Sequence, residues 1–269
     1  MDTLHQALRG AQHTVPRSVP VLHAMLVVGG GGALGSAVLA EALVAGRFSR
    51  VMALVAEPVA SGVRGFEPLP MAALSLPGLH SLHMTPPVPA AIIVFERQRN
   101  SNGRDDAFVQ PAPQDLLPLA RLLRARGVQR LLVVVPHAPA MLPQALSHGL
   151  ATLDEAAVAA LGFEHLVFLR AAQSLRPERT GSRLQRFAVW WLAQLSWMVP
   201  QRQQPVRAAT LARCVVQLAR LLPGTPPGTQ VIAPETLWLW GQAEGGFESG
   251  AASGLARVLQ PRPQAGAPP

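Results

Sequence analysis

Two residue types are absent from this chain. Its 269 residues include no tyrosine, and all 23 basic residues are arginine, so there is no lysine either. The chain therefore has neither a phenol nor an ammonium side chain for a proton relay, and arginine is no substitute because it keeps its proton near neutral pH. The compositional bias of a GC-rich coding sequence would explain the absence of lysine, but it would not restore lysine's chemistry.

Cysteine and charge are scarce. The single cysteine, Cys214, excludes an internal disulfide and fits a reducing compartment, and its apolar neighbours predict a core helix. Charged residues make up 14% of the chain, yet the net charge is +8. The arginines are scattered, and Arg121 and Arg124 fall on the outer face of a predicted helix, which favours a solvated surface over a phosphate-binding patch. No nucleic-acid partner is expected.

Long apolar runs are also lacking. The longest one near the C-terminus, Phe187–Val199, is too short to cross a bilayer and contains Gln194 and Ser196. The N-terminus carries Asp2 and no long apolar stretch, which argues against a signal peptide. We therefore expect a cytoplasmic protein without a membrane span.

The chain does contain an alternation of short apolar runs with longer amphipathic segments. Such an alternation predicts an α/β fold, a Rossmann-like doubly wound parallel sheet with a small C-terminal lobe. Strands buried on both faces read as continuous apolar runs. The predicted strands are Met25–Val28, Val51–Val55, Ala91–Phe95, Leu131–Val135 and Leu166–Leu169, and the predicted helices are 34–45, 114–126 and 144–161. The proline-rich stretch 66–89 leaves room for one short strand.

The ends of the chain differ in character from its centre. Residues 1–22 show no periodicity and predict an extension, and residues 249–269 are rich in Gly, Ala and Pro and predict a disordered tail. Between them we expect one Rossmann-like domain over 23–248, in which 171–248 form the C-terminal lobe that binds a substrate or a partner.

A run of glycines follows the first predicted strand and opens the first predicted helix. Glycine has no Cβ to hold a ligand away from the backbone, and a helix N-terminus carries partial positive charge, so this context favours a dinucleotide pyrophosphate. The alternative is a tight packing turn without a ligand. The predicted cofactor-binding residues of the turn are Gly29, Gly30, Gly32, Ala33, Leu34 and Gly35.

An acidic residue, Glu57, lies just past the second predicted strand. At this place a carboxylate can accept hydrogen bonds from the adenosine ribose, and it would repel the 2′-phosphate of NADP. The sequence therefore favours NAD slightly over NADP, although Arg64 could reverse that preference. The alternative is a solvated loop acid.

The residues around the turn carry a family resemblance. The segments 27–35 and 46–51, then 126–131 and 162–165, resemble the atypical short-chain dehydrogenase/reductases, in the branch that includes the Tat-interacting oxidoreductase-like proteins. The resemblance covers about residues 24–240 and implies an NAD(P)-binding fold.

The resemblance also implies catalytic positions. The family uses a serine after the fifth strand and a Tyr-x-x-x-Lys pair on the next helix. An ungapped comparison puts Val135 and Pro136 at the serine, Ser147 at the tyrosine and Ala151 at the lysine. All three roles are lost, and the family's NADP-favouring arginine falls at Ala56 and Glu57. The resemblance therefore implies a non-catalytic, dinucleotide-binding or regulatory protein.

Replacement chemistry is an alternative. His137 follows the fifth predicted strand, and His148 adjoins Ser147, so these three side chains are candidates for a proton relay in an oxidoreductase. The competing interpretation is that both histidines are ordinary surface or supporting residues. No metal site is expected, because His80 and His83 have no further ligand at useful spacing.

All five tryptophans lie in the C-terminal third of the chain. The segment Arg183–Met198 carries two apolar stripes at helical spacing, and Trp238 and Trp240 are expected to pack with it. These stripes favour a core helix, with a lid over an apolar ligand or a protein-binding face as the alternative. A third functional class is therefore an interaction protein with a purely structural glycine turn, and a homodimer is compatible with it.

Overall fold

The computed structural model describes residues 24–71, 88–96, 105–137, 152–172 and 206–242. In chain order its strands are β1 (Met25–Val28), β2 (Val51–Val55), β3 (Phe66–Pro70), β4 (Ala90–Val94), β5 (Arg130–His137), β6 (His165–Ala172) and β7 (Gly228–Ile232). Its helices are α2 (Gly32–Val44), α4 (Leu116–Ala125), α6 (Leu153–Ala159), α8 (Ala208–Leu221) and α9 (Pro234–Gln242), with short 3-10 turns at 105–107, 113–115 and 222–224.

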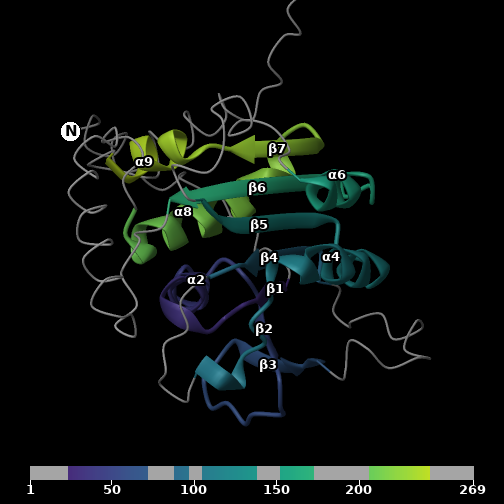
Figure 1. The fold of residues 1–269 in the computed structure, drawn as a ribbon. Helices are drawn as coiled ribbons and strands as arrows, with labels where there is room; N and C mark the ends of the chain where they lie inside the picture. Colours follow the sequence, from purple (N-terminus) through teal and green to yellow (C-terminus); the bar gives the residue numbers. More distant parts are fainter. Residues whose placement is uncertain (1–23, 72–87, 97–104, 138–151, 173–205, 243–269) are drawn as a thin grey trace, which may run out of the picture.

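The seven strands form one parallel sheet in the order β3-β2-β1-β4-β5-β6-β7 (Figure 1). The order runs outward from β1 in one direction and from β4 in the other, so the sheet is doubly wound. The predicted α/β, Rossmann-like fold is confirmed.

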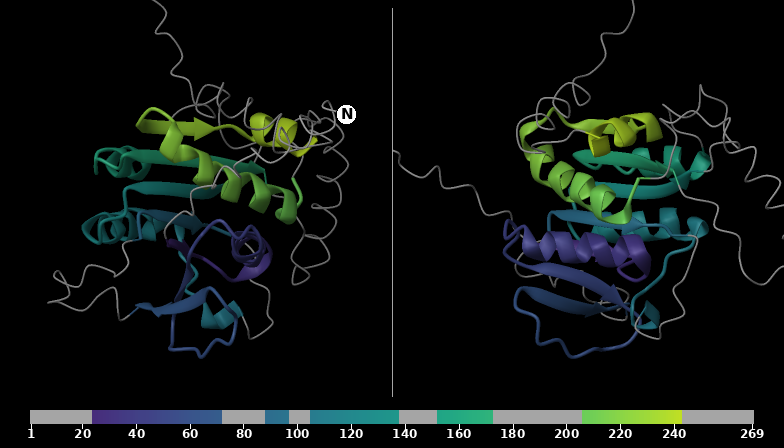
Figure 2. Two further views of the ribbon diagram at one scale, coloured as in Figure 1. Left: turned by 180° about the vertical axis from the view of Figure 1, so that it is seen from behind. Right: turned by 90° about the vertical axis from the view of Figure 1, so that its left-hand side faces the viewer.

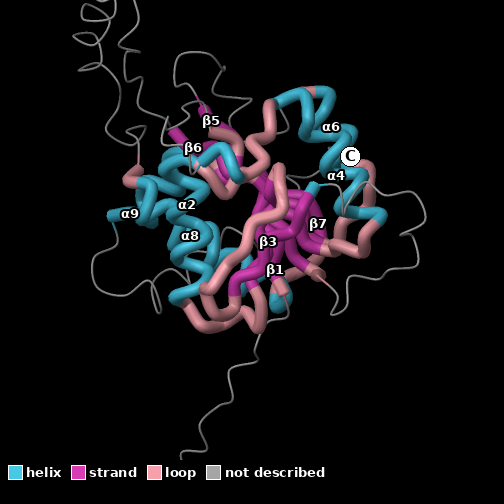
Figure 3. The backbone as a smooth tube through the Cα atoms, turned by 90° about the horizontal axis from the view of Figure 1, so that it is seen from below, coloured by secondary structure: helices cyan, strands magenta, loops and turns pink. Residues whose placement is uncertain are grey.

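The central strands are apolar on both faces because helices cover both. In β1, Met25 and Val27 pack into one core and Leu26 and Val28 into the other. Residues of α2, α8 and α9 complete the first core, and residues of α4 and α6 complete the second. Figure 3 shows these two helical layers on opposite sides of the strands, and the views in Figure 2 agree. This burial on two sides is why the strand sequences show no polar alternation.

The predicted C-terminal lobe, 171–248, is described only over 171–172 and 206–242. Helix α8 lies on the same face of the sheet as α2, and it contains the fully buried Cys214 as predicted. Strand β7 adds a seventh strand to the sheet beside β6. Residues 206–242 are therefore built onto the main sheet.

Several expectations fall outside the described residues, including the extension 1–22, the tail 249–269 and the tryptophan-bearing segment 183–198. Of the predicted helix 144–161, the structure describes 152–161, where α6 lies. Among the described helices, none has both the length and the apolar character that a bilayer crossing requires.

Candidate functional site

The winding of the sheet changes direction between β1 and β4. The chain leaves β1 for α2 on one face, and it leaves β4 for α4 on the other. Connections that diverge in this way open a crevice at the carboxyl ends of the two strands, which is where open α/β sheets bind ligands. The predicted glycine turn lies at this crevice, directly after β1.

The turn is packed too tightly for side chains at two of its glycines. Gly29 has a φ of 86°, and a Cβ built on it would overlap the carbonyl oxygen of Val94 at the end of β4. A Cβ on Gly35, in the first turn of α2, would overlap the carbonyl oxygen of Gly29. Since both obstacles are backbone atoms, neither can move aside cheaply. These two glycines let α2 start directly against the ends of β1 and β4.

The N-terminus of α2 already holds a carboxylate. The backbone N–H of Ala33 donates to Oε1 of Glu96 at 3.1 Å, and the N–H of Leu34 donates to Oε1 and Oε2, each at 3.2 Å. The helix has no side-chain cap from its own N-cap residue, Gly31. Glu96 therefore acts as the capping anion from a distant part of the chain, where backbone donors and the helix dipole favour negative charge.

Glu96 reaches this position because it follows β4 by two residues. Phe95, between β4 and Glu96, is buried in the core shared with α4, and its N–H donates to the carbonyl of Val134 at 3.0 Å. Gly32, at the start of α2, has a φ of 75°, and the position that a Cβ would take on it is occupied by the Glu96 carboxylate. Sequence reasoning missed Glu96. The available signal was its place as the first polar residue after the apolar run that forms β4.

A short segment before α4 covers the carboxyl end of β2. The N–H of Ala56 donates to the carbonyl of Ala107 at 2.9 Å, and the N–H of Val109 donates to the carbonyl of Leu54 at 3.1 Å. Phe108 lies between these bonds, and a Cβ on Gly30 would be 2.9 Å from its Cδ1. The glycine turn is thus bordered by Glu96 on one side and by Phe108 on another.

Glu57 follows Ala56 and is exposed. Arg64, the residue that could reverse the preference for NAD, is exposed as well. The structure therefore places Glu57 just beyond the end of β2, as the spacing predicts, and its role toward a ribose stays a prediction.

The catalytic candidates are described only in part. Val135 and Pro136 lie within β5, and His137 is the last residue of that strand, paired with Ala172 of β6. His137 is thus at the carboxyl edge of the sheet. Ser147, His148 and Ala151 lie outside the described residues, as do His80 and His83.

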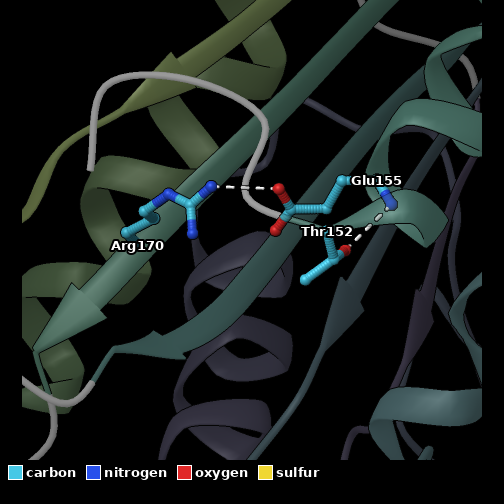
Figure 4. Close-up of polar contacts among 3 residues, drawn as sticks. All are labelled: Thr152, Glu155 and Arg170. Atoms are coloured by element: carbon cyan, nitrogen blue, oxygen red, sulfur yellow. Dashed lines mark hydrogen bonds and ion pairs between the residues drawn. The ribbon is translucent and has the colours of Figure 1, made fainter. Parts of the chain in front are cut away.

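A buried ion pair lies close to the carboxyl end of β6. Nη2 of Arg170, on β6, is 3.0 Å from Oε2 of Glu155, on α6, and both side chains are almost fully buried. The N–H of Glu155 donates to Oγ1 of Thr152 at 3.1 Å, which caps α6 (Figure 4). Sequence reasoning did not identify this pair, since its partners are 15 residues apart on different elements.

The described residues offer neither a reactive cysteine nor a metal site. Burial raises the pKa of the Cys214 thiol to about 12, so this cysteine is a core residue rather than a nucleophile. Among the described residues, no three His, Cys, Asp or Glu side chains gather in an arrangement that could hold a metal ion.

Comparison with known proteins finds similarity only among solved structures. No protein-family model matches the chain, and no curated protein does. The Bordetella bronchiseptica enzyme WbmG in complex with NAD is 16% identical, with 86% of this chain and 81% of that chain covered and a TM-score of 0.45. WbmH from the same organism, in complex with NAD+, is 15% identical, with 80% of this chain and 78% of that chain covered and a TM-score of 0.40.

A third solved structure, the UDP-N-acetylglucosamine 4-epimerase from Bacillus cereus, is 15% identical, with 78% of each chain covered and a TM-score of 0.42. Identity this low carries no information about the chemistry of the site.

Proposed function

We propose that this protein binds a nicotinamide dinucleotide, NAD or NADP, at the crevice between β1 and β4. The observation that carries the proposal is the anion held at the N-terminus of α2, where Ala33 and Leu34 donate to a carboxylate. These donors suit a pyrophosphate for the same electrostatic reason that they suit Glu96. The crevice lies where the winding of a doubly wound sheet reverses, which is the usual place for such a ligand.

The glycines of the turn also keep its backbone close to the carboxyl ends of β1 and β4, where the ligand would bind. Gly29 and Gly35 keep the turn and α2 in close contact, and the absent side chain of Gly32 leaves a volume beside the donors that the Glu96 carboxylate occupies in this structure. Gly30 packs against Leu39 and Phe108, since a Cβ on it would lie 2.7 Å and 2.9 Å from their nearest atoms. When bound, a nicotinamide cofactor would supply hydride exchange. The chain's own residues would bind its phosphates and orient it.

The choice between the two dinucleotides rests on the end of β2. Glu57 carries a negative charge just past this strand, and that charge favours a free ribose over a 2′-phosphate. We therefore propose NAD as the preferred ligand. Replacing Glu57 with Gln should raise the affinity for NADPH relative to NADH, and an unchanged ratio would assign selectivity to another residue such as Arg64.

We further propose that the bound dinucleotide serves a regulatory or structural role rather than reduction of a carbonyl. The chain contains no tyrosine and no lysine, so it has no side chains for the relay that the atypical short-chain dehydrogenase/reductases use. General acid-base catalysis contributes about 10²- to 10⁴-fold in rate, so an enzyme without its relay would be slow.

Calorimetric titration with NADH and NADPH tests binding. The disruptive variant is Gly32→Asp, which adds a carboxylate beside the donors of α2. Its matched control is Gly162→Asp, because Gly162 has a φ of 72°, close to the 75° of Gly32, but has open space around it. Both variants introduce a similar backbone strain, because the two φ angles are similar. Only Gly32→Asp also places a side chain in the crevice.

Binding by the wild type and by Gly162→Asp, together with loss of binding in Gly32→Asp, would support the proposal. Absence of binding both in the wild type and in a variant that lacks the Glu96 carboxylate would contradict it. A protein that binds neither nucleotide in any form would instead have a purely structural glycine turn. Attention would then move to the tryptophan-rich part of the chain as an interaction surface.

A second function, an oxidoreductase with a different proton relay, is favoured by one observation. His137 is the last residue of β5, at the carboxyl edge where the ligand would bind. Histidine exchanges protons near neutral pH. Turnover of NADH with a carbonyl substrate that His137→Ala abolishes, while NADH binding is retained, would establish this function over the regulatory one.

A further inference from the structure

The candidate phosphate-binding donors are engaged by the chain itself. Three hydrogen bonds join the N–H groups of Ala33 and Leu34 to the two carboxylate oxygens of Glu96. A pyrophosphate that used the same donors would need them released, because the Glu96 carboxylate already accepts from both N–H groups. Glu96 and the phosphates of a dinucleotide therefore exclude one another at this helix N-terminus.

The carboxylate also fills the space beside the donors. A Cβ on Gly32 would lie 2.8 Å from Cδ of Glu96. The bare face of Gly32, which allows a ligand to approach the backbone in such turns, is therefore in contact with Glu96. The side chain occupies both the hydrogen-bonding positions and the volume that the phosphates would take.

Charge adds to this competition. Glu96 carries the same sign as a pyrophosphate, and a displaced carboxylate on a fixed backbone stays close to the bound ligand. The backbone of this segment is held by Phe95, which is buried and bonded to Val134. Like charges at short distance repel, so Glu96 disfavours the ligand even after it has left the donors.

We infer that Glu96 is a built-in competitor that lowers the affinity of the site for phosphate-bearing nucleotides. This inference rests on the proposed dinucleotide function. When Glu96 caps α2 the site is closed to a pyrophosphate, and when its side chain rotates away the same donors are available. If the carboxylate holds the donors about nine-tenths of the time, the apparent dissociation constant is raised about tenfold.

Two substitutions of Glu96 separate its contributions. Glu96→Ala removes the carboxylate and the occupied volume, and we expect about a tenfold or larger gain in affinity for NADH. Glu96→Gln removes the charge but keeps an amide oxygen that can accept from the donors, so a smaller gain is expected. Asp106→Asn is the control, because Asp106 is an exposed acid in the same connection between β4 and α4. It should leave the affinity unchanged.

The choice of ligand gives a second control. ADP-ribose and NADH both carry the pyrophosphate, whereas adenosine carries no phosphate. The gain in Glu96→Ala should therefore extend to ADP-ribose and be absent for adenosine. Amide chemical shifts of Ala33 and Leu34 provide a direct reading, since both should change in Glu96→Ala and again when NADH binds to the wild type.

The outcomes distinguish failure of the inference from failure of the function. Tighter binding in both Glu96 variants, with Asp106→Asn unchanged, supports the inference, including the case in which only the variants bind measurably. Binding by the wild type with equal or weaker binding by folded Glu96 variants overturns the inference and leaves the function standing. Absence of NADH and ADP-ribose binding in every folded form overturns both. Thermal unfolding shows which variants are folded, and Glu96→Gln serves if Glu96→Ala does not fold.

Discussion

The guanidinium of Arg170 and the carboxylate of Glu155 form an ion pair that is almost completely buried, with Nη2 3.0 Å from Oε2. The pair joins β6 to α6 (Figure 4). Helix α6 lies on the face of the sheet that α4 also covers. Burial makes each charge costly to leave alone, whereas the two together offset much of the desolvation. The pair therefore ties the short helix α6 to the sheet.

Removing either partner should destabilise the fold strongly. For Arg170→Met and for Glu155→Leu we expect losses of about 3–5 kcal/mol each, because each leaves a buried charge behind. The double variant should lose much less than the sum of the two. Urea unfolding of the four proteins gives the coupling energy, and additive losses would show that the two charges do not stabilise one another.

The pair between Arg50 and Glu67 is the natural comparison. Its atoms are closer, at 2.6 Å, but the two side chains are 26% and 41% exposed. Exposed ion pairs contribute about 0–1 kcal/mol because water already solvates both charges. Arg50→Met should therefore cost no more than about 1 kcal/mol, which separates the effect of burial from that of distance.

Gly35→Ala should destabilise the protein, although alanine in place of glycine usually stabilises a helix. Alanine inside a helix is favoured over glycine by about 0.5–1 kcal/mol. At Gly35 the added methyl group would overlap the carbonyl oxygen of Gly29, so we expect a loss of about 1–3 kcal/mol and weaker NADH binding. Urea unfolding and calorimetry measure the two effects.

Gly224→Ala controls for the loss of glycine flexibility. Gly224 is exposed, has a negative φ and has open space around it. Its replacement should change stability by no more than about 0.5 kcal/mol. A Gly35→Ala protein as stable as the wild type would mean that the turn can move away from α2.

The sequence predicted the five strands that lie inside the sheet but missed β7, one of its two edge strands. The central strands are covered on both faces, so they read as apolar runs. Strand β7 has a single sheet neighbour, β6, and Gly228 and Thr229 at its start are exposed, so it shows no such run. For the other edge strand, β3, the sequence allowed one short strand within 66–89 without fixing its position.

The candidate site was predictable in part for a related reason. The glycine turn follows from local sequence, because strand, glycines and helix are contiguous. The contact between Glu96 and the start of α2 spans more than 60 residues and depends on the register of β4 beside β1, in which Ile93 pairs with Val28. The periodicity of apolar residues and the propensities of single residues do not predict how two strands align with one another. The ion pair of Arg170 with Glu155 escaped prediction in the same way.

Cys214 should be inert in the folded protein. It is fully buried in α8, and burial raises its pKa to about 12, so at about pH 8 only about one thiol in 10⁴ is a thiolate. We expect no reaction with a thiol-specific disulfide reagent on the timescale of minutes, and complete reaction in denaturant. Rapid labelling of the native protein, monitored by absorbance, would show that α8 opens readily or that the thiol is accessible.

We expect His165, the first residue of β6, to make the stability of the fold depend on pH. Burial lowers its pKa below the ordinary value, the nearby Arg130 lowers it further, and Glu164 opposes the shift. Because the folded state disfavours the protonated imidazole, the fold keeps its full stability above about pH 6.5, the usual pKa of histidine. Stability then falls as the pH drops through the lowered pKa of the folded state.

Replacing His165 with Gln should remove this part of the pH dependence. Urea unfolding between about pH 7.5 and pH 5 should show a smaller loss of stability in His165→Gln than in the wild type, whatever the offset between the two at pH 7.5. Glu164→Gln should act in the opposite direction, since the pKa of His165 falls further without the carboxylate 3.7 Å from its Nε2. Parallel pH profiles for all three proteins would show that His165 is not the residue whose protonation weakens the fold.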